Sequence, residues 1–111
     1  MQQRETRNVA VVGTGTIGAS WAAYFLSRGL RVRASDPAPQ AEAGLRRFVD
    51  EAWPVLKELG AAANVVPQEA LVFCPDPETA VTDADFVQES APEREPIKQA
   101  LLARIDAVLP P

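Results

Sequence analysis

A short valine-rich run that stops at a glycine loop constrains this 111-residue chain more than any other feature. Asn8–Val12 is mostly apolar and ends at Gly13, which predicts a strand buried on both faces of a parallel sheet. Across Thr16–Ser27, apolar residues recur at helical spacing, and Arg28 and Gly29 are typical of the end of a helix. The sequence therefore predicts a central strand, a tight loop and a helix in succession.

The rest of the chain continues to alternate between strand and helix patterns. Residues 30–35 alternate apolar and polar side chains before Asp36 and Pro37, which predicts a second strand. Residues 41–59 carry an apolar stripe at helical spacing, but Pro54 leaves open whether they form one helix or two. Further elements are expected as short strands at residues 71–74 and 85–89, a short helix at Pro77–Val81 and an amphipathic helix at residues 97–108. This alternation favours a three-layer α/β fold with a parallel sheet.

Residues 13–18 follow the pattern G-x-G-x-x-G, and their context gives that pattern a meaning. The first glycine ends a predicted strand, the third lies in the first turn of a predicted helix, and Asp36 follows 18 residues after Gly18. Together these features are typical of a Rossmann fold that binds a dinucleotide. The alternative is that the glycines only shape a tight turn and that Asp36 caps the turn made with Pro37. That alternative does not predict the three features together.

Each loop residue has a distinct expected role. Gly13 allows the sharp turn, Gly15 leaves the backbone open to a pyrophosphate, and Gly18 lets the helix pack close to the strand. The N–H groups of Thr16 and Ile17 are expected to point at the phosphates from the positive end of the helix. No Lys or Arg is needed for such a site.

Asp36 indicates which dinucleotide is preferred. Its carboxylate can accept hydrogen bonds from the adenosine ribose hydroxyls, and it would repel an additional 2′-phosphate. Arg33 is the nearby cation that could oppose this preference, but its place in the strand alternation favours a solvated face. The sequence therefore predicts NAD rather than NADP as the cofactor.

Composition excludes several other classes of function. The net charge is −4, with 11 basic and 15 acidic residues, and the basic residues are scattered, which argues against a nucleic-acid partner. The apolar stretches are too short to cross a membrane and the N-terminus has no signal-peptide pattern, so a cytoplasmic protein is expected. The chain has one cysteine, Cys74, and no histidine, so we expect neither an internal disulfide nor a metal site. Cys74 itself is expected to be a small buried apolar residue.

Two segments resemble a known family. Residues 9–18, followed by Trp21-Ala22-Ala23, resemble the beginning of the L-3-hydroxyacyl-CoA dehydrogenase superfamily. Residues 84–94, with Lys98 after them, are similar to the ADxVxExxPE…K segment of that superfamily. The resemblance implies an NAD-binding Rossmann domain.

Finer features of the sequence point within the superfamily. Residues 53–54 and 88–90 are most similar to its L-carnitine dehydrogenase branch, and next to its lambda-crystallin (gulonate dehydrogenase) branch. The resemblance implies that Ser90 lies beside the nicotinamide end, that Glu93 contacts the nicotinamide ribose and that Lys98 reaches towards the cofactor. From the residues alone, Glu93 is also typical of a helix N-terminus and Lys98 of an exposed helix position.

The resemblance spans only about the first third of a typical family member. It implies a parent protein that oxidises a 3-hydroxy acid, L-carnitine or a 3-hydroxyacyl-CoA, by hydride transfer to NAD, and that forms a homodimer. The family's catalytic histidine and its C-terminal helical domain would lie beyond residue 111, so no catalytic residue is expected here. We therefore expect residues 1–111 to be a partial N-terminal domain, truncated before the later strands of its sheet, with an open edge prone to self-association. The alternative is a free-standing NAD-binding or sensing module without catalysis.

Overall fold

β1 (Asn8–Val12) lies at the centre of the parallel sheet in the computed structural model, which describes residues 7–61 and 63–90. Its neighbours are β2 (Arg31–Ser35) and β4 (Phe86–Glu89), and β3 (Leu71–Phe73) pairs with β2. Within the described residues the strand order is β3-β2-β1-β4, with every pairing parallel. The predicted central parallel strand is confirmed.

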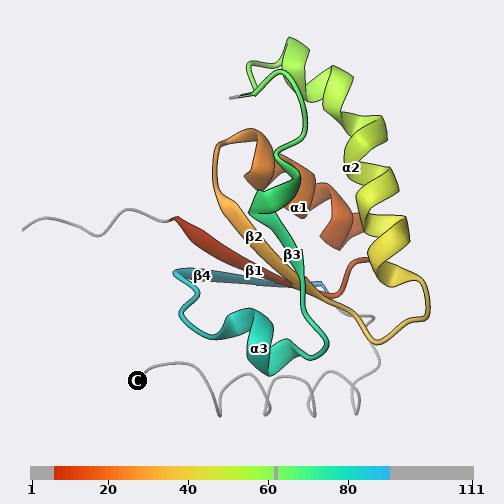
Figure 1. Ribbon diagram of the computed structural model, residues 1–111, viewed down its shortest axis with the longest axis vertical. Coiled ribbons are helices and arrows are strands. Elements are labelled where there is room, and N and C mark those ends of the chain that lie inside the picture. Colours follow the sequence, from red (N-terminus) through yellow and green to blue (C-terminus); the bar gives the residue numbers. More distant parts are fainter. Residues whose placement is uncertain (1–6, 62, 91–111) are drawn as a thin grey trace, which may run out of the picture.

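Alternate residues of β1 enter two different apolar cores. Val9 and Val11 pack with the residues of two helices on one face of the sheet, whereas Ala10 and Val12 pack with Cys74 on the other. A strand that is buried on both faces needs cover on both, and this produces three layers. Figure 1 shows α1 and α2 on one side of the sheet and α3 on the other.

The helices and strands begin and end close to the predicted residues. The helical segments are α1 (Thr16–Ser27), α2 (Ala41–Glu58), the short 3-10 helix η1 (Gln68–Ala70) and α3 (Pro77–Val81). The strands differ from the prediction by a single residue at one end each, except β1, which matches it. The amphipathic helix predicted at residues 97–108 lies outside the described residues.

α2 is a single helix, which decides between the one or two helices that the sequence left open. It continues through Pro54, whose side chain is exposed, so the ring meets solvent rather than the core. Leu45, Val49 and Trp53 form its buried stripe, and the indole N–H of Trp53 donates to the carbonyl of Ala63 at 3.2 Å. Leu56, beyond the proline, is partly buried against the same core. Packing on both sides of Pro54 therefore holds the helix together where the backbone lacks one donor.

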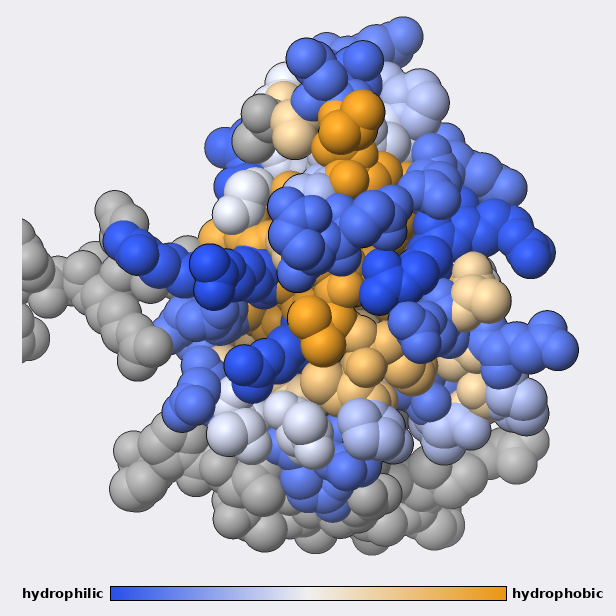
Figure 2. All heavy atoms as spheres, viewed as in Figure 1, coloured by the Kyte–Doolittle hydropathy of each residue, from blue (hydrophilic) through white to orange (hydrophobic). Residues whose placement is uncertain are grey.

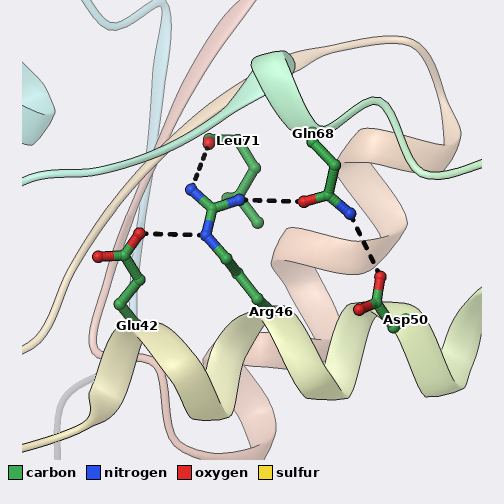
Figure 3. A network of polar contacts seen from close by, with 5 residues as sticks. All are labelled: Glu42, Arg46, Asp50, Gln68 and Leu71. Atoms are coloured by element: carbon green, nitrogen blue, oxygen red, sulfur yellow. Dashed lines mark hydrogen bonds and ion pairs between the residues drawn. The ribbon is translucent and has the colours of Figure 1, made fainter.

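A polar network fastens α2 to the beginning of β3 (Figure 3). The guanidinium of Arg46 donates to Glu42 at 3.1 Å, to Gln68 Oε1 at 3.2 Å and to the carbonyl of Leu71 at 3.0 Å. The amide of Gln68 in turn donates to Asp50 Oδ1 at 3.4 Å, one turn further along α2. The planar donors of Arg46 thus connect α2 to β3, the outermost strand of the described sheet on the side of β2.

The two outermost strands of the described sheet both carry exposed apolar side chains. Figure 2 shows apolar side chains in the middle of the viewed face, where β3 crosses Figure 1, with hydrophilic side chains around them. Val72 of β3 and Phe86 of β4 are both 48% exposed. Phe86 also meets Phe25 of α1 with ring centroids 6.1 Å apart. Among the described residues, no helix is long and apolar enough to span a membrane.

Candidate functional site

The predicted site residues that the structure describes meet at the carboxyl end of the sheet. The chain runs from β1 outward to β2 and β3 and then returns to β4 on the other side of β1. In open α/β sheets, ligands bind outside the carboxyl ends of the strands at the point where the strand order reverses. Here that point lies between β1 and β4, where Gly13 and Ser90 follow the two strands.

Gly13 makes the turn from β1 into the loop. Its φ is +93°, a conformation that L side chains adopt only at a cost, so this position favours glycine. Its N–H donates to the carbonyl of Ser35 at 2.8 Å, which prolongs the pairing of β1 with β2 by one bond. The loop therefore leaves the sheet at a fixed place.

Gly18 lies where the first turn of α1 approaches the end of β1. A Cβ added at Gly18 would lie 1.7 Å from the carbonyl oxygen of Gly13, far inside any tolerable contact, and 3.4 Å from the Cβ of Ser90. Any larger residue would force the helix away from the strand. The predicted role of Gly18 in close packing is confirmed by this geometry.

Gly15 differs from Gly18 because none of the described residues crowds it. An added Cβ would meet no atom of residues 7–61 and 63–90 within 4 Å, and its φ of −64° is one that any residue adopts. Gly15 is the N-cap of α1, and the first turn of this helix contains no acidic residue. Thr16 and Ile17, which begin the helix, are both exposed. Free N–H groups at the positive end of a helix, beside an open backbone, suit a phosphate group.

Asp36 lies at the end of β2 and binds two backbone N–H groups. Its Oδ2 accepts from Thr14 at 2.7 Å, and its Oδ1 accepts from Ala38 at 2.8 Å. The second bond is the turn cap that the sequence offered as the alternative role for Asp36. The two roles coexist, since an ionised carboxylate has about four lone-pair positions and only two are used here.

Arg33 does not compete with Asp36 for a cofactor phosphate in this arrangement. Its side chain is exposed, as predicted, and its Nη1 donates to the carbonyl of Thr82 just after α3 at 2.9 Å. The guanidinium is therefore engaged with the layer on the α3 side of the sheet. This geometry is consistent with a preference for NAD.

Ser90 is brought to the glycine loop by the pairing of β4 with β1. Its N–H donates to the carbonyl of Val12 at 2.8 Å, and its hydroxyl lies 3.5 Å from the side-chain nitrogen of Gln88. Ser90 is therefore a neighbour of the loop across the end of the sheet. Glu93 and Lys98, the other two predicted cofactor residues of this segment, lie outside the described residues.

Sequence reasoning missed Thr14, which contributes two features to the loop. Its N–H donates to Asp36, and its hydroxyl oxygen is buried without a hydrogen-bond partner among residues 7–61 and 63–90. The bond to Asp36 depends on how closely two segments 22 residues apart approach each other, which no spacing rule reports. The only available signal was its place as a variable position of the glycine loop.

Cys74 follows β3 and belongs to the core rather than to the site. It is 4% exposed, and burial raises the pKa of its thiol, an effect that Asp76 reinforces and Arg33 opposes. The predicted buried apolar role is confirmed. Among residues 7–61 and 63–90, no cluster of His, Cys, Asp or Glu has the composition of a metal site.

Comparison with known families identifies the kind of domain to which this geometry belongs. The family model described as "3-hydroxyacyl-CoA dehydrogenase, NAD binding domain" matches residues 8–111. The chain belongs to this family. Membership in the 3-hydroxyacyl-CoA dehydrogenase family confirms the Rossmann fold and NAD as the cofactor, both predicted from the sequence.

Individual members of the 3-hydroxyacyl-CoA dehydrogenase family are also similar to the chain. It is 53% identical over 106 residues to the L-carnitine dehydrogenase of Streptomyces griseus, and 56% identical over 104 residues to that of Nocardiopsis dassonvillei. These alignments cover 96% and 94% of the chain but 31% of each relative. The chain thus spans about a third of the length of these relatives.

A solved structure gives the same picture of the fold. The crystal structure of an NAD⁺-dependent dismutase, 5-formyl-3-hydroxy-2-methylpyridine 4-carboxylic acid 5-dehydrogenase, is 36% identical to the chain, with a TM-score of 0.81. The match covers 96% of this chain and 34% of that one. The backbone fold is therefore shared with a protein whose name gives a substrate other than L-carnitine.

Proposed function

We propose that this chain holds NAD with the pyrophosphate at the beginning of α1 and the adenosine ribose at Asp36. The observation that carries the proposal is the open space at Gly15, beside a helix end with no acidic residue. The N–H groups of Thr16 and Ile17 would serve the phosphates there, and Gly13 and Gly18 would shape the loop around them. The remaining lone pairs of Asp36 are available to ribose hydroxyls.

The nicotinamide half of the cofactor would extend towards β4. Ser90 supports this direction because it lies beside the loop at the end of that strand. Glu93 at the nicotinamide ribose and Lys98 near the cofactor remain part of the proposal on the strength of the family resemblance. Bound there, NAD would supply a hydride acceptor.

The parent reaction we propose is oxidation of the 3-hydroxyl group of a small acid, L-carnitine or a 3-hydroxyacyl-CoA, to a carbonyl group. NAD held at this site would supply the acceptor for the hydride of the C–H bond, and a general base would take the hydroxyl proton. The sequence contains no histidine, so an imidazole base would have to lie outside these 111 residues. Support for the L-carnitine class comes from relatives of that name at 53% and 56% identity.

We also propose how this domain belongs to the whole protein. Residues 1–111 would be the N-terminal NAD-binding part of a longer homodimeric enzyme, with a helical domain that completes the substrate cleft. Its partners would be the small-molecule substrate and a second copy, and its compartment the cytoplasm. The greater length of the relatives supports the proposal that these residues are part of a longer protein.

Calorimetric titration with NAD and with NADP tests the cofactor site directly. We expect NAD to bind, and NADP to bind at least about tenfold more weakly because its 2′-phosphate would face the carboxylate of Asp36. Equal affinity for the two cofactors would contradict the proposed place of the ribose. Absence of binding to either would contradict the site as a whole.

The second candidate is an NAD-binding or sensing module without catalysis, which the same cofactor loop would serve equally well. An assay of NADH formation separates the two functions. The protein made from the entire reading frame should reduce NAD in the presence of L-carnitine or a 3-hydroxyacyl-CoA if the dehydrogenase proposal holds. NAD binding without reduction by either substrate would favour the module.

A further inference from the structure

The carboxylate of Asp36 is held by backbone N–H groups from two directions. Oδ1 accepts from Ala38, two residues further along, in the manner of a local turn. Oδ2 accepts from Thr14 at 2.7 Å, and Thr14 belongs to the glycine loop after another strand. Hydrogen bonds to an ionised acceptor are shorter and stronger than neutral ones, so the second bond is a substantial tie between β2 and the loop.

The place of this tie in the loop matters for its effect. Gly13, on one side of Thr14, is bonded through its own N–H to Ser35. Gly15, on the other side, begins α1 and has open space around it. Thr14 is thus the last residue of the loop that is bonded to β2 before the backbone turns to the open side. Its hydroxyl oxygen is buried as well, although the residue as a whole is only partly buried.

We propose that Asp36 is a positioning residue for the pyrophosphate loop, acting through the N–H of Thr14, in addition to its role at the ribose. Because the Thr14 N–H is directed at Asp36, it is not a phosphate donor, and the bond fixes the direction of the donors that follow it. The residue that selects the ribose then also shapes the site for the phosphates. This inference rests on the proposed NAD site and adds a second role to one of its residues.

The proposal makes a distinctive statement about cofactor preference. Removing the carboxylate would take away the repulsion towards a 2′-phosphate, but it would also release the loop. Replacing Asp36 alone is therefore expected to weaken NAD binding without a matching gain for NADP. A residue that acted only on the ribose would exchange one affinity for the other.

A comparison of two ligands and two proteins separates the roles. The ligands are NAD and an NAD analogue whose adenosine carries a 2′,3′-dideoxyribose, which has no hydroxyl group for Asp36 to bind. The proteins are the unmodified chain and Asp36→Ala. If Asp36 positions the loop, the variant should bind the dideoxy analogue about tenfold more weakly than the unmodified chain does. Equal affinity of both proteins for the analogue would overturn the proposal.

Two further variants keep the result interpretable. Asp36→Asn retains one oxygen acceptor and should recover part of the affinity for the analogue. Asp76→Ala is the matched control for Asp36→Ala, because Asp76 also accepts a backbone N–H, from Thr79 at 2.7 Å, but it caps α3. It makes the same change in charge and removes a comparable cap, and it should leave the affinity for the analogue unchanged. A loss as large as that of Asp36→Ala would mean that general destabilisation explains both.

Amide hydrogen exchange at Thr14 supplies a readout that needs no cofactor. Protection of the Thr14 N–H is expected in the unmodified chain and should fall in Asp36→Ala while protection in β1 persists. Unchanged protection would overturn the positioning role. If the unmodified chain bound no NAD, the proposed function would fail while the exchange result still decided the role of Asp36.

Discussion

At Gly18 the polypeptide has no room for a single additional carbon atom, because the carbonyl of Gly13 occupies that space. At Gly15, three residues earlier, the same atom would project into empty space. The fold of the chain therefore requires Gly18, whereas Gly15 leaves space that a ligand can occupy. Stability and binding should respond to different glycines of the same loop.

Two alanine substitutions, with a third as their control, test this separation. Gly18→Ala should lower the free energy of unfolding by about 1–3 kcal/mol, a typical cost of overpacking. Gly15→Ala should leave stability almost unchanged but weaken NAD binding, because its methyl group would occupy the space proposed for the pyrophosphate. Chemical denaturation and calorimetry measure the two effects.

Gly44 in α2 is the matched control for both. It is exposed within a helix, and an added Cβ would meet no atom within 4 Å. Gly44→Ala should therefore raise stability by about 0.5–1 kcal/mol and leave NAD binding unchanged. If Gly15→Ala bound NAD as well as Gly44→Ala does, the pyrophosphate could not lie where we propose.

Cys74 gives the chain a pH dependence above neutrality. Burial raises the pKa of its thiol from the ordinary value of 9.0, so the unfolded chain loses this proton at a lower pH than the folded one. The contribution of Cys74 to stability is present below about pH 9 and declines as the pH rises through the range above it. Urea denaturation at about pH 8 and about pH 10 should show this decline, and Cys74→Ala should show a smaller one. Identical declines would contradict the burial effect.

The helix α1 shows how far periodicity in the sequence can be trusted. The spacing of the large apolar residues predicts the helix correctly, yet Ile17, Trp21 and Tyr24 are exposed. The buried face is formed by small residues, Ala19, Ala22 and Ala23 among them. Gly18 brings the beginning of the helix close to the sheet, where these small side chains fit, whereas the larger Leu26 is buried near the end of the helix. Spacing predicts that a helix forms, whereas its distance from the sheet decides which face is buried.

For α2 the sequence left the number of helices undecided because the proline and the apolar stripe indicate opposite outcomes. The proline removes one donor and strains the preceding turn, whereas the stripe favours a continuous buried face. The exposed position of Pro54 and the burial of Trp53 decide in favour of one helix. The sequence does not reveal that Pro54 is exposed and Trp53 is buried, because this depends on the rotation of the helix on the sheet.

The contribution of the Arg46 network can be measured on the same helix. Arg46→Ala should lower the free energy of unfolding by about 1 kcal/mol and reduce the exchange protection of β3, since the carbonyl of Leu71 loses its donor. The effect is limited because the Arg46 side chain is 32% exposed. Arg47→Ala is the control, as Arg47 is exposed on the same helix. Equal effects of the two substitutions would show that the network contributes nothing measurable.

For the molecule as a whole, the sequence predicts the layers better than the contacts between them. The buried valines of β1 and the regular alternation of strands and helices predict a parallel three-layer sheet, and this is confirmed. The bond between Thr14 and Asp36 was not predictable, because it arises only when two strand ends lie side by side. Glu93 and Lys98 remain predictions, as does self-association through an open edge.

The pairing of β1 with β4 has a consequence for how the protein is made. Asp85 Oδ2 accepts the N–H groups of Arg7 and Asn8 at 2.9 Å each, which joins residues 78 and 77 positions apart. During translation the first strand leaves the ribosome long before its second neighbour exists, and such distant pairings form slowly. Ser90 reaches the glycine loop only after β4 has joined the sheet. The nascent chain therefore acquires its cofactor loop early and the surroundings of that loop late.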